Sequence, residues 1–429
     1  MMKRISIAGL SLILILSINL EAQNTIKDYN LEALKSKQAS KFRIGGYGEI
    51  LYQRMDYGAN QKASEFGSLS EDRAVVSLPR LILSFEYDFT SDLTFSTEIE
   101  FENGGTGNAM ELEFEESGEY EAEVEKGGEV VLEQFHLTKR FSNAFNVRAG
   151  HFILGVGQIN HRHLPTDYFG TIRPEGETAI LPSTWHETGF EIFGRILDWS
   201  YRVQVVNGLD ANGFSSSNWI KAGRQTKFEE VRATNLAYVG RLEYHGVQGL
   251  NVGASLYTGK SADNVVKSGI MDGLDGRVTI FSAHASLKTG SWIARANFLK
   301  GNLTDATQIS AVNGRLSSNS QYPRTPVAEG ALNYGGEVGY NVLKFFPNVK
   351  TRLYPFARYE YYNTMKDVTS SQVADPRFDR EVYTFGLNYM MKSNVAIKLD
   401  YAMRKMDGGN FNDENTLGLA IVFSGIFLK

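Results

Sequence analysis

The sequence predicts an all-β protein: a closed antiparallel transmembrane β-barrel of about 16 strands, with short periplasmic turns and long extracellular loops. Three observations support this prediction. The chain of 429 residues begins with an export signal, apolar and polar side chains alternate along most of it, and short connections take turns with long ones. Alternation with a period of two indicates strands that have one apolar face.

The start of the chain has the pattern of a secretory signal peptide. Lys3 and Arg4 precede an apolar run from Ile5 to Leu16, and the segment that follows ends in the small residue Ala22. The run is shorter than the roughly 20 apolar residues of a membrane-spanning helix, so we expect cleavage near Ala22. The predicted organisation is a signal peptide at 1–22, a periplasmic N-terminal segment at 23–41 and an outer-membrane barrel at 42–429.

Composition excludes several classes of protein and site. The chain has no cysteine, so neither disulfides nor thiol chemistry is available to the exported protein. Past the signal, charged and polar residues interrupt every apolar stretch before it reaches the length of a spanning helix. Cleavage removes Lys3, Arg4 and Glu21, which changes the formal net charge from −5 to −6 and argues against nucleic acid as a partner. We expect no cofactor.

One pair of runs shows the repeating unit. From Leu81 to Phe89, leucine and aromatic residues on one parity face serine and acidic residues on the other. The segment Thr90-Ser91-Asp92 then forms a turn, and the same alternation resumes from Leu93 to Glu102. Further short turns are predicted at 141–145, 197–199, 244–250, 287–292, 343–350 and 389–395. Long polar connections are predicted at 55–78, 103–130, 155–186, 207–234, 258–278, 301–330, 363–380 and 406–413.

An even number of strands allows the barrel to close. The first strand, near Phe42 to Gln53, and the last, from Thr416 to Phe427, then end on the same side and pair, which leaves no unpaired backbone in lipid. A secreted β-sandwich or propeller also alternates. It has no reason, however, to place every short connection at one end, or aromatic residues such as Trp199 and Trp292 at strand ends. We therefore predict a protein of the bacterial outer membrane.

If the apolar parity faces lipid, the other parity lines the lumen and is strongly charged. Its basic residues are Arg148, Arg195, Arg202, Arg241, Arg295, Arg358, Lys398 and Arg404. Its acidic residues are Glu86, Asp88, Glu98, Glu100, Glu102, Glu191, Glu243, Glu337, Glu360 and Asp400. Two interpretations stay open: opposed walls of charge that set ion preference, or cross-strand pairs that stiffen the wall. Both require water in the interior.

The third long connection, after Phe152, is predicted to fold inward. A barrel of this size leaves a wide aqueous channel unless something narrows it, and this glycine-rich segment is the candidate. It also carries His161, His163 and Asp167, which raises the question of a metal site. That spacing is weak evidence for a set of four ligands, so we predict a solvated or hydrogen-bonded cluster and no metal.

The second long connection contains a dense run of glutamates between Glu111 and Glu129. Such a run usually forms a solvated outer surface. Because hard oxygen ligands are abundant there, a calcium-bridged or electrostatic gate is the alternative.

Three segments together resemble the phosphate-selective porin O and P family: Arg148–Phe152 (RAGHF), Phe169–Glu177 (FGTIRPEGE) and Trp185–Gly189 (WHETG). The resemblance extends loosely from about Phe42 to Phe427. It implies a homotrimeric 16-stranded porin whose third loop narrows the pore and whose basic residues draw anions toward the constriction.

Carried over by position, the resemblance makes Arg162 and Arg173 the loop candidates and Arg148, Arg195 and Arg202 the adjoining wall. Together with the arginines of lumenal parity, the predicted pore-lining or solute-binding set is Arg148, Arg162, Arg173, Arg195, Arg202, Arg241, Arg295 and Arg358.

The sequence thus favours a passive diffusion channel for small polar, anionic, phosphate-like solutes, with the lipid bilayer, lipopolysaccharide and two further copies of the chain as partners. We expect no enzyme. Histidines occur at His136, His151, His245 and His284 in the strand regions, but no nucleophile signature such as G-x-S-x-G accompanies them. The alternative function is a surface-exposed barrel that acts as an adhesin or partner scaffold through its long loops.

Overall fold

A computed structural model describes residues 41–58, 72–113, 121–182, 184–225, 228, 230–265, 269–316, 325–346, 348–406 and 413–428, with side chains 106–127 left out. The predicted signal peptide, almost all of the segment 23–41, and the side chains of most of the acidic run lie outside the described residues. Among the residues that the structure describes, no helix is long and apolar enough to cross a membrane.

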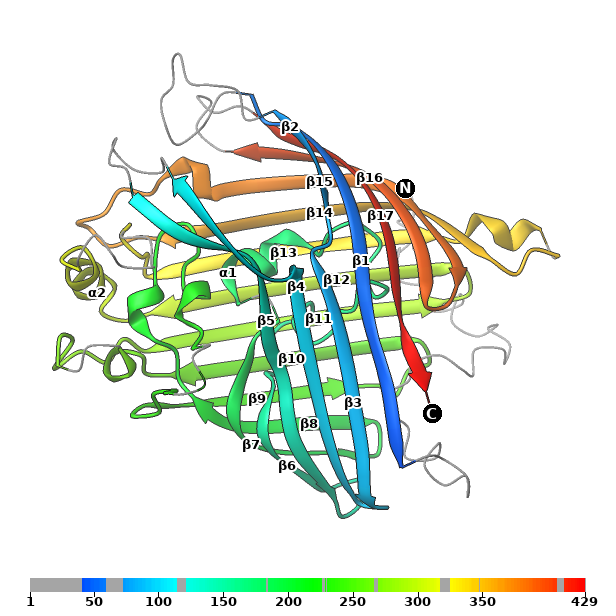
Figure 1. Cartoon of the computed structure of the whole chain (residues 1–429), viewed down its shortest axis with the longest axis horizontal. Helices are drawn as coiled ribbons and strands as arrows, with labels where there is room; N and C mark the ends of the chain where they lie inside the picture. Colours follow the sequence, from blue (N-terminus) through cyan, green and yellow to red (C-terminus); the bar gives the residue numbers. More distant parts are fainter. Residues whose placement is uncertain are drawn as a thin grey trace, which may run out of the picture. The chain divides into compact units, whose positions relative to one another are not determined.

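The described chain forms one antiparallel sheet (Figure 1). Its strands are β1 (Phe42–Asp56), β2 (Arg73–Ser77), β3 (Arg80–Thr90), β4 (Leu93–Glu113), β5 (Glu121–Arg140), β6 (Asn146–Ile153), β7 (His186–Ile196), β8 (Trp199–Asn207), β9 (Leu236–Tyr244), β10 (Leu250–Gly259), β11 (Val278–Thr289), β12 (Trp292–Leu303), β13 (Gly330–Tyr340), β14 (Arg352–Asp367), β15 (Asp379–Lys392), β16 (Val395–Met406) and β17 (Glu414–Leu428). The short helices are α1 (Glu175–Ile180), η3 (Ala211–Gly213), η4 (Lys221–Gly223), η5 (Ala262–Asn264), α2 (Ala306–Asn313), η6 (Val342–Phe345) and η7 (Pro376–Phe378).

The sheet closes on itself because β1 pairs antiparallel with β17, with Tyr47 opposite Ser424. On its other side β1 pairs with both β2 and β3. These two are successive pieces of one wall strand, interrupted near Pro79, which has no N–H to give to a ladder. The 17 described strands therefore make a barrel of 16. The predicted closed antiparallel barrel is confirmed.

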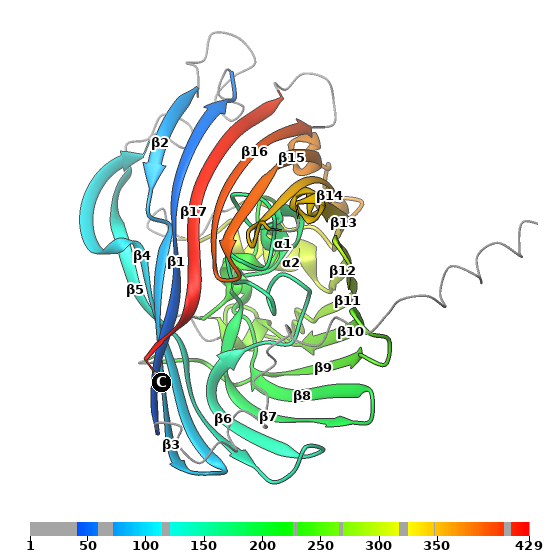
Figure 2. The ribbon, with the colours of Figure 1, turned by 90° about the vertical axis from the view of Figure 1, so that its right-hand side faces the viewer.

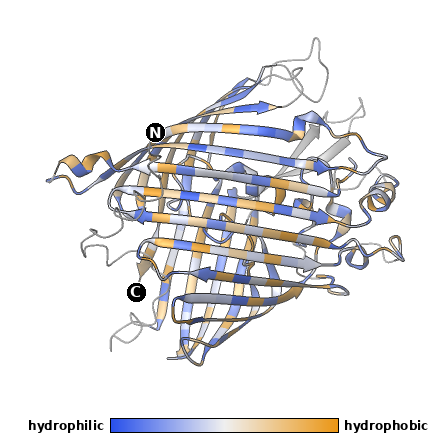
Figure 3. Cartoon of the chain, turned by 180° about the vertical axis from the view of Figure 1, so that it is seen from behind, coloured by the Kyte–Doolittle hydropathy of each residue, from blue (hydrophilic) through white to orange (hydrophobic). Residues whose placement is uncertain are grey.

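Alternation along the strands separates an outer from an inner face. On β17, Leu417, Leu419 and Ile421 are exposed, whereas the intervening Ala420 and Val422 are buried. Hydrophobic and hydrophilic residues take turns along most strands (Figure 3). An apolar surface of this extent around a closed sheet is stable in lipid, because neighbouring strands pair their backbone groups all the way around the barrel. The fold is that of a bacterial outer-membrane barrel.

The connections also follow the prediction, since short turns join β3–β4, β7–β8, β11–β12 and β15–β16, and longer segments lie at the opposite end. Aromatic rings pair beside the short turns, as in Trp199 with Tyr244 at 4.9 Å and Trp292 with Tyr340 at 4.7 Å between ring centroids. Amphipathic aromatic rings of this kind favour the lipid headgroup level.

The prediction of a loop at 103–130 was wrong in part. β4 continues to Glu113 and β5 begins at Glu121, so most of the acidic run belongs to an extended hairpin (Figure 2). Alternating acidic and apolar residues can form a strand whether it lies in water or in lipid. In the observed register, Glu111 lies opposite Glu123. A smaller correction concerns His245, which lies one residue past the end of β9 rather than on a strand.

Candidate functional site: the inner loop and the arginine wall

The connection from β6 to β7 crosses the interior of the barrel, as the sequence predicted for the third long segment. We call its described residues, 154–182 and 184–185, the inner loop. Figure 2 shows α1, which belongs to it, inside the ring of strands. Its contacts reach opposite sides of the wall: the Gly157 N–H donates to Ser282 of β11, and Thr166 bonds Ser424 of β17 at 2.9 Å.

Lys398 of β16 anchors the middle of the inner loop. Its ammonium is fully buried and donates to three backbone carbonyls, those of Pro165, Tyr168 and Gly170, at 2.5, 2.9 and 2.8 Å. Three N–H donors thereby satisfy three carbonyl groups that the irregular loop backbone would otherwise leave unpaired. Lys398 points into the barrel, as alternation predicts. Its ammonium group, however, holds the backbone of the inner loop in place.

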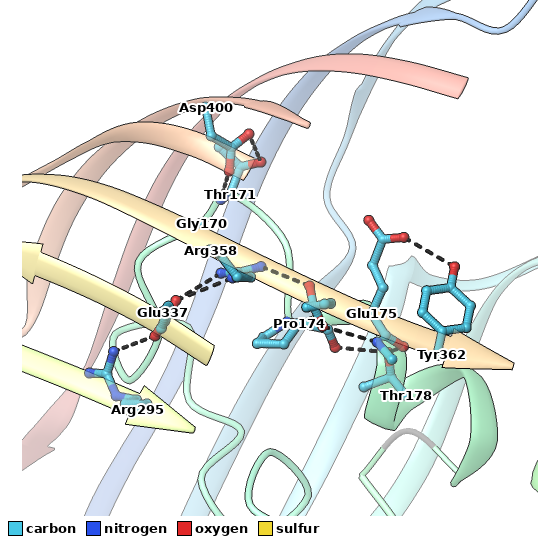
Figure 4. A network of polar contacts seen from close by, with 12 residues as sticks. Gly170, Thr171, Pro174, Glu175, Thr178, Arg295, Glu337, Arg358, Tyr362 and Asp400 are labelled. Carbon is cyan, nitrogen blue, oxygen red and sulfur yellow. Dashed lines mark hydrogen bonds and ion pairs between the residues drawn. The ribbon is translucent and has the colours of Figure 1, made fainter. Parts of the chain in front are cut away.

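Asp400 provides a second anchor on the same strand. Its carboxylate accepts the backbone N–H and the hydroxyl of Thr171, as Figure 4 shows. A carboxylate that accepts two donors from one residue fixes both the position and the rotation of that residue. The two side chains lie two positions apart on β16, so one face of this strand holds the loop at two points.

Charged side chains of the barrel wall hold the helix α1 in place. The Arg404 guanidinium contacts the Glu175 carboxylate, with Nε 2.8 Å from both carboxylate oxygens, and Glu360 accepts the Gly176 N–H at 3.0 Å. Burial alone would raise the pKa of Glu175, but Arg404 outweighs this effect and holds that pKa below its ordinary value. The Tyr362 hydroxyl also donates to Glu175 (Figure 4).

Glu177 braces the inner loop from within. Its carboxylate accepts the backbone N–H groups of Gln158 and Asn160, at 2.9 and 2.8 Å. Burial raises the pKa of Glu177, although these two donors oppose the rise. Gly157 permits this arrangement, because its φ is +76° and a Cβ there would lie 2.2 Å from a Glu177 carboxylate oxygen.

Three of the predicted arginines hold the loop or neighbouring acids. Arg241 is buried and donates to the Gly157 carbonyl at 2.6 Å. Arg295 and Arg358 both contact Glu337, and the Arg295 guanidinium lies 5.0 Å from the Phe169 ring centroid. For Arg295 and Arg358, these contacts fit the interpretation in which charged side chains pair across neighbouring strands and stiffen the wall.

The space between the inner loop and this part of the wall is small. A cavity of about 20 Å³ is lined by Gln158, Ile159, Pro174, Arg295, Asn297, Gly336, Glu337, Arg358 and Glu360. This volume accommodates about one water molecule. The inner loop is therefore packed closely against β12–β14 at this point.

Two other predicted arginines lie together on β6 and β8 and remain partly exposed. Arg148 of β6 and Arg202 of β8 both contact the fully buried carboxylate of Glu191, at 2.8 and 3.1 Å, while their own side chains stay 18% and 27% exposed. Both guanidinium groups also lie over the Phe193 ring. One carboxylate cannot neutralise two guanidinium groups, so these three side chains together carry a net positive charge. Glu86 and Glu98 also act electrostatically on Arg148. We call Arg148, Arg202 and Glu191 the arginine wall.

Arg162 extends this positive region from the loop side. It is half-buried, and among the described residues its guanidinium has no hydrogen-bond or ion-pair partner. It interacts electrostatically with Arg241 and Asp167. Arg173 is half-buried and directly precedes Pro174 at the start of α1. Arg195 lies apart from these residues, since it is exposed at the short-turn end and donates to the Leu197 carbonyl.

Sequence reasoning left out other lumenal cations. Arg140 of β5 donates to Thr94 at 2.7 Å and interacts with Arg148, and Arg43 of β1 pairs with Glu86 and Asp88. The parity rule that selected Arg148 also selects Arg140, so the same signal was present in the sequence. Both residues lie on strands whose lipid-facing parity is clearly apolar.

Comparisons with known proteins agree with this fold. An uncharacterized protein from Aquifex aeolicus is 31% identical over 379 residues, covering 86% of this chain and 77% of that protein. Among solved structures, OmpF of Salmonella typhi in complex with daunomycin has a TM-score of 0.55 at 12% identity, covering 90% of this chain and 98% of that one. The outer-membrane channel DcaP of Acinetobacter baumannii has a TM-score of 0.51 at 12% identity, covering 91% and 99%. No protein-family model matches the chain.

Proposed function

We propose that this chain, which belongs to the same protein family as the uncharacterized protein of Aquifex aeolicus, is a passive diffusion channel for small polar solutes. Sixteen strands enclose a lumen wide enough for water, and the charged inner face is stable only if water fills it. The inner loop occupies part of this lumen, so solutes pass through a narrower opening beside it. Passage then requires a concentration gradient and no chemical step.

We further propose that the channel prefers anions and accepts phosphate-like solutes. The observation that carries this proposal is the arginine wall, where Arg148 and Arg202 share Glu191 and both stay partly exposed. The Arg162 guanidinium has no hydrogen-bond or ion-pair partner among the described residues, and it acts electrostatically on His161 together with Arg202. A guanidinium presents a planar fork of donors that matches a phosphate or carboxylate. The resemblance to phosphate-selective porins points to the same solutes.

The direct test is the current through purified protein in a planar lipid bilayer. In a salt gradient, the reversal potential reports whether anions or cations pass more easily, and we expect a value that indicates anion preference. Arg162→Gln is the informative variant, because it removes a charge without leaving a buried partner, and it should move the reversal potential toward cation preference. Arg277→Gln, which removes an arginine that is 41% exposed at the long-loop end, is the matched control and should leave the potential unchanged.

Three outcomes would contradict parts of this proposal. Protein that inserts without carrying current would overturn the channel and favour the adhesin or scaffold function. A cation-selective wild type would overturn the anion preference alone. If added phosphate reduced the chloride current equally in wild type and in Arg162→Gln, Arg162 would have no part in binding phosphate.

Assembly as a homotrimer, in contact with lipopolysaccharide, is part of the same proposal. It rests on the resemblance to phosphate-selective porins. Native mass spectrometry of the protein in detergent measures it, and a monomer or dimer would contradict it.

A further inference from the structure

A register shift on β5 turns one carboxylate into the lumen. Glu98 of β4 pairs with Gln134, but the next residue, Ile99, pairs with Leu132, so Glu133 is the extra residue of a β-bulge. Without the bulge, Glu133 would share the outward parity of Phe135, which is 53% exposed. With the bulge, Glu133 is fully buried in the interior. Bulges commonly re-aim side chains at functional sites.

The bulge brings Glu133 to a histidine of the inner loop. One carboxylate oxygen each of Glu98 and Glu133 and one ring nitrogen of His163 all lie within 4.8 Å of one another. The three residues come from β4, β5 and the inner loop, so the cluster joins the loop to the wall. Glu98 is half-buried, which leaves a path from the lumen.

The histidine is oriented as metal ligands usually are. His163 Nδ1 lies 3.2 Å from the backbone carbonyl of Asn160. A carbonyl only accepts, so Nδ1 carries the hydrogen and Nε2 keeps a lone pair for an ion. Metal-binding histidines typically donate their second N–H in this way, which fixes the tautomer and the ring.

The carboxylate of Glu133 has an oxygen without a partner. Its Oε2 accepts the Tyr47 hydroxyl at 3.4 Å, whereas Oε1 is buried and accepts no hydrogen bond from an N–H or O–H donor of the described residues. The carboxyl groups of Glu133 and Glu100 lie close enough to share a proton. An unpaired buried carboxylate oxygen is costly. On Glu98, Oε2 accepts the Gln134 amide. Each carboxylate is thus oriented by one donor at one oxygen.

Negative charge is also in excess around this cluster. Arg80 interacts electrostatically with Glu133 and Glu100, but it already pairs with Glu49 at 2.7 Å. Arg148 also acts electrostatically on Glu98 and Arg224 on Glu100, but Arg148 already pairs with Glu191. The four carboxylates of Glu98, Glu100, Glu133 and Glu49 therefore still outnumber these three guanidinium groups. Buried anions in such excess need either protons or a cation.

We propose that Glu98, Glu133 and His163 bind a divalent transition-metal ion such as Zn²⁺, which ties the inner loop to the wall. One imidazole nitrogen and two carboxylate oxygens are donors that Zn²⁺ accepts, with water from the lumen completing the coordination. Ligand bonds of about 2.0–2.2 Å are reached from the observed spacing by small side-chain rotations. The ion supplies the charge that the carboxylates lack and a partner for Glu133 Oε1.

The test uses the full chain in detergent, freed of metal with a chelator. Co²⁺ is titrated while the visible absorption spectrum is recorded, and Zn²⁺ then displaces it. We expect one ion per chain, with affinity about tenfold or more weaker in Glu133→Gln and in His163→Gln. His161→Gln is the matched control, because His161 lies on the same loop outside the cluster, and it should bind as the wild type does.

A second readout does not depend on the spectrum. Zn²⁺ should raise the midpoint of thermal unfolding of the wild type and of His161→Gln but not of Glu133→Gln, because a ligand of the folded state stabilises it. Circular dichroism confirms the barrel in each variant, and Glu98→Gln replaces any variant that does not fold. Absence of binding would overturn the proposal in favour of shared protons. Binding that persists in Glu98→Gln, Glu133→Gln and His163→Gln would assign the ion to another site and overturn it equally.

Discussion

Arg404 and Glu175, 229 residues apart in the chain, form an ion pair that joins β16 to the helix of the inner loop. The pair is almost enclosed, with side chains 6% and 18% exposed. Water screens it little, and each group depends on the other for its charge to be stable. The position of α1 inside the barrel therefore depends on this contact.

The first prediction concerns this pair. Glu175→Gln should lower the free energy of unfolding by about 3 kcal/mol, because it leaves the Arg404 guanidinium buried without its counter-charge. The measurement is the midpoint of denaturant unfolding, followed by circular dichroism in detergent. Glu230→Gln, which alters an exposed pair with Arg232, should change stability by less than about 0.5 kcal/mol. If the two variants lowered the free energy of unfolding equally, the Arg404–Glu175 pair would contribute no more stability than an exposed pair.

The second prediction concerns Gly157. Gly157→Ala should cost about 1–2 kcal/mol for the positive φ alone, and more because the new methyl group meets Glu177. The displaced loop should also change the single-channel conductance. Gly240→Ala is the control, since a Cβ at Gly240 meets no atom within 4 Å. A wild-type conductance in Gly157→Ala would mean that the loop tolerates the shift or does not limit the current.

The third prediction concerns Lys398. Lys398→Met should leave the three carbonyls of Pro165, Tyr168 and Gly170 without a donor and destabilise the protein by about 3 kcal/mol or more. Single-channel currents should become noisier as the loop loosens. Lys300→Met removes a half-exposed lysine whose contact with Asp367 is 3.7 Å, and it should leave both readouts nearly unchanged.

The fourth prediction concerns pH. Burial raises the pKa of Asp210, in the β8–β9 connection, to about 6, although the Asn212 N–H opposes the rise. A carboxyl whose folded pKa exceeds its unfolded value of about 3.9 favours folding when protonated, so its contribution is present below about pH 4 and is lost as pH rises through 6. Asp210→Asn should flatten stability across this window and still cap η3. The control Asp263→Asn alters an exposed carboxyl nearby, and an unchanged slope in Asp210→Asn would contradict the prediction.

Much of the barrel could be predicted because strand alternation is local. The hairpin from Leu81 to Glu102 appears in the sequence as two runs of period two around a turn, and the structure pairs Leu81 with Phe101 as expected. The short turns follow from similar local patterns, whereas the inward fold of the third long segment follows from the width of a 16-stranded barrel and the glycines of that segment. The extended β4–β5 hairpin was missed because acidic residues were interpreted as a loop, although the alternation continues through Glu113.

The contacts of the lumen were harder to predict because they join distant residues. Alternation shows that Arg148 and Arg358 both face inward. It cannot show that the Arg148 side chain stays 18% exposed while that of Arg358 is 3% exposed, between Glu337 and Glu360. The orientation of Glu133 was beyond any parity rule, because a single bulge reverses it. Residue type and spacing predict which side chains of each strand point into the barrel. Which partners those side chains contact depends on the path of the inner loop.

Several anchors of the inner loop lie in the last two strands of the chain. Lys398, Arg404 and Ser424 lie on β16 and β17, and β17 is also the strand that closes the barrel against β1. A chain truncated before β16 therefore lacks both the strand that completes the cylinder and the side chains that hold the middle of its internal segment.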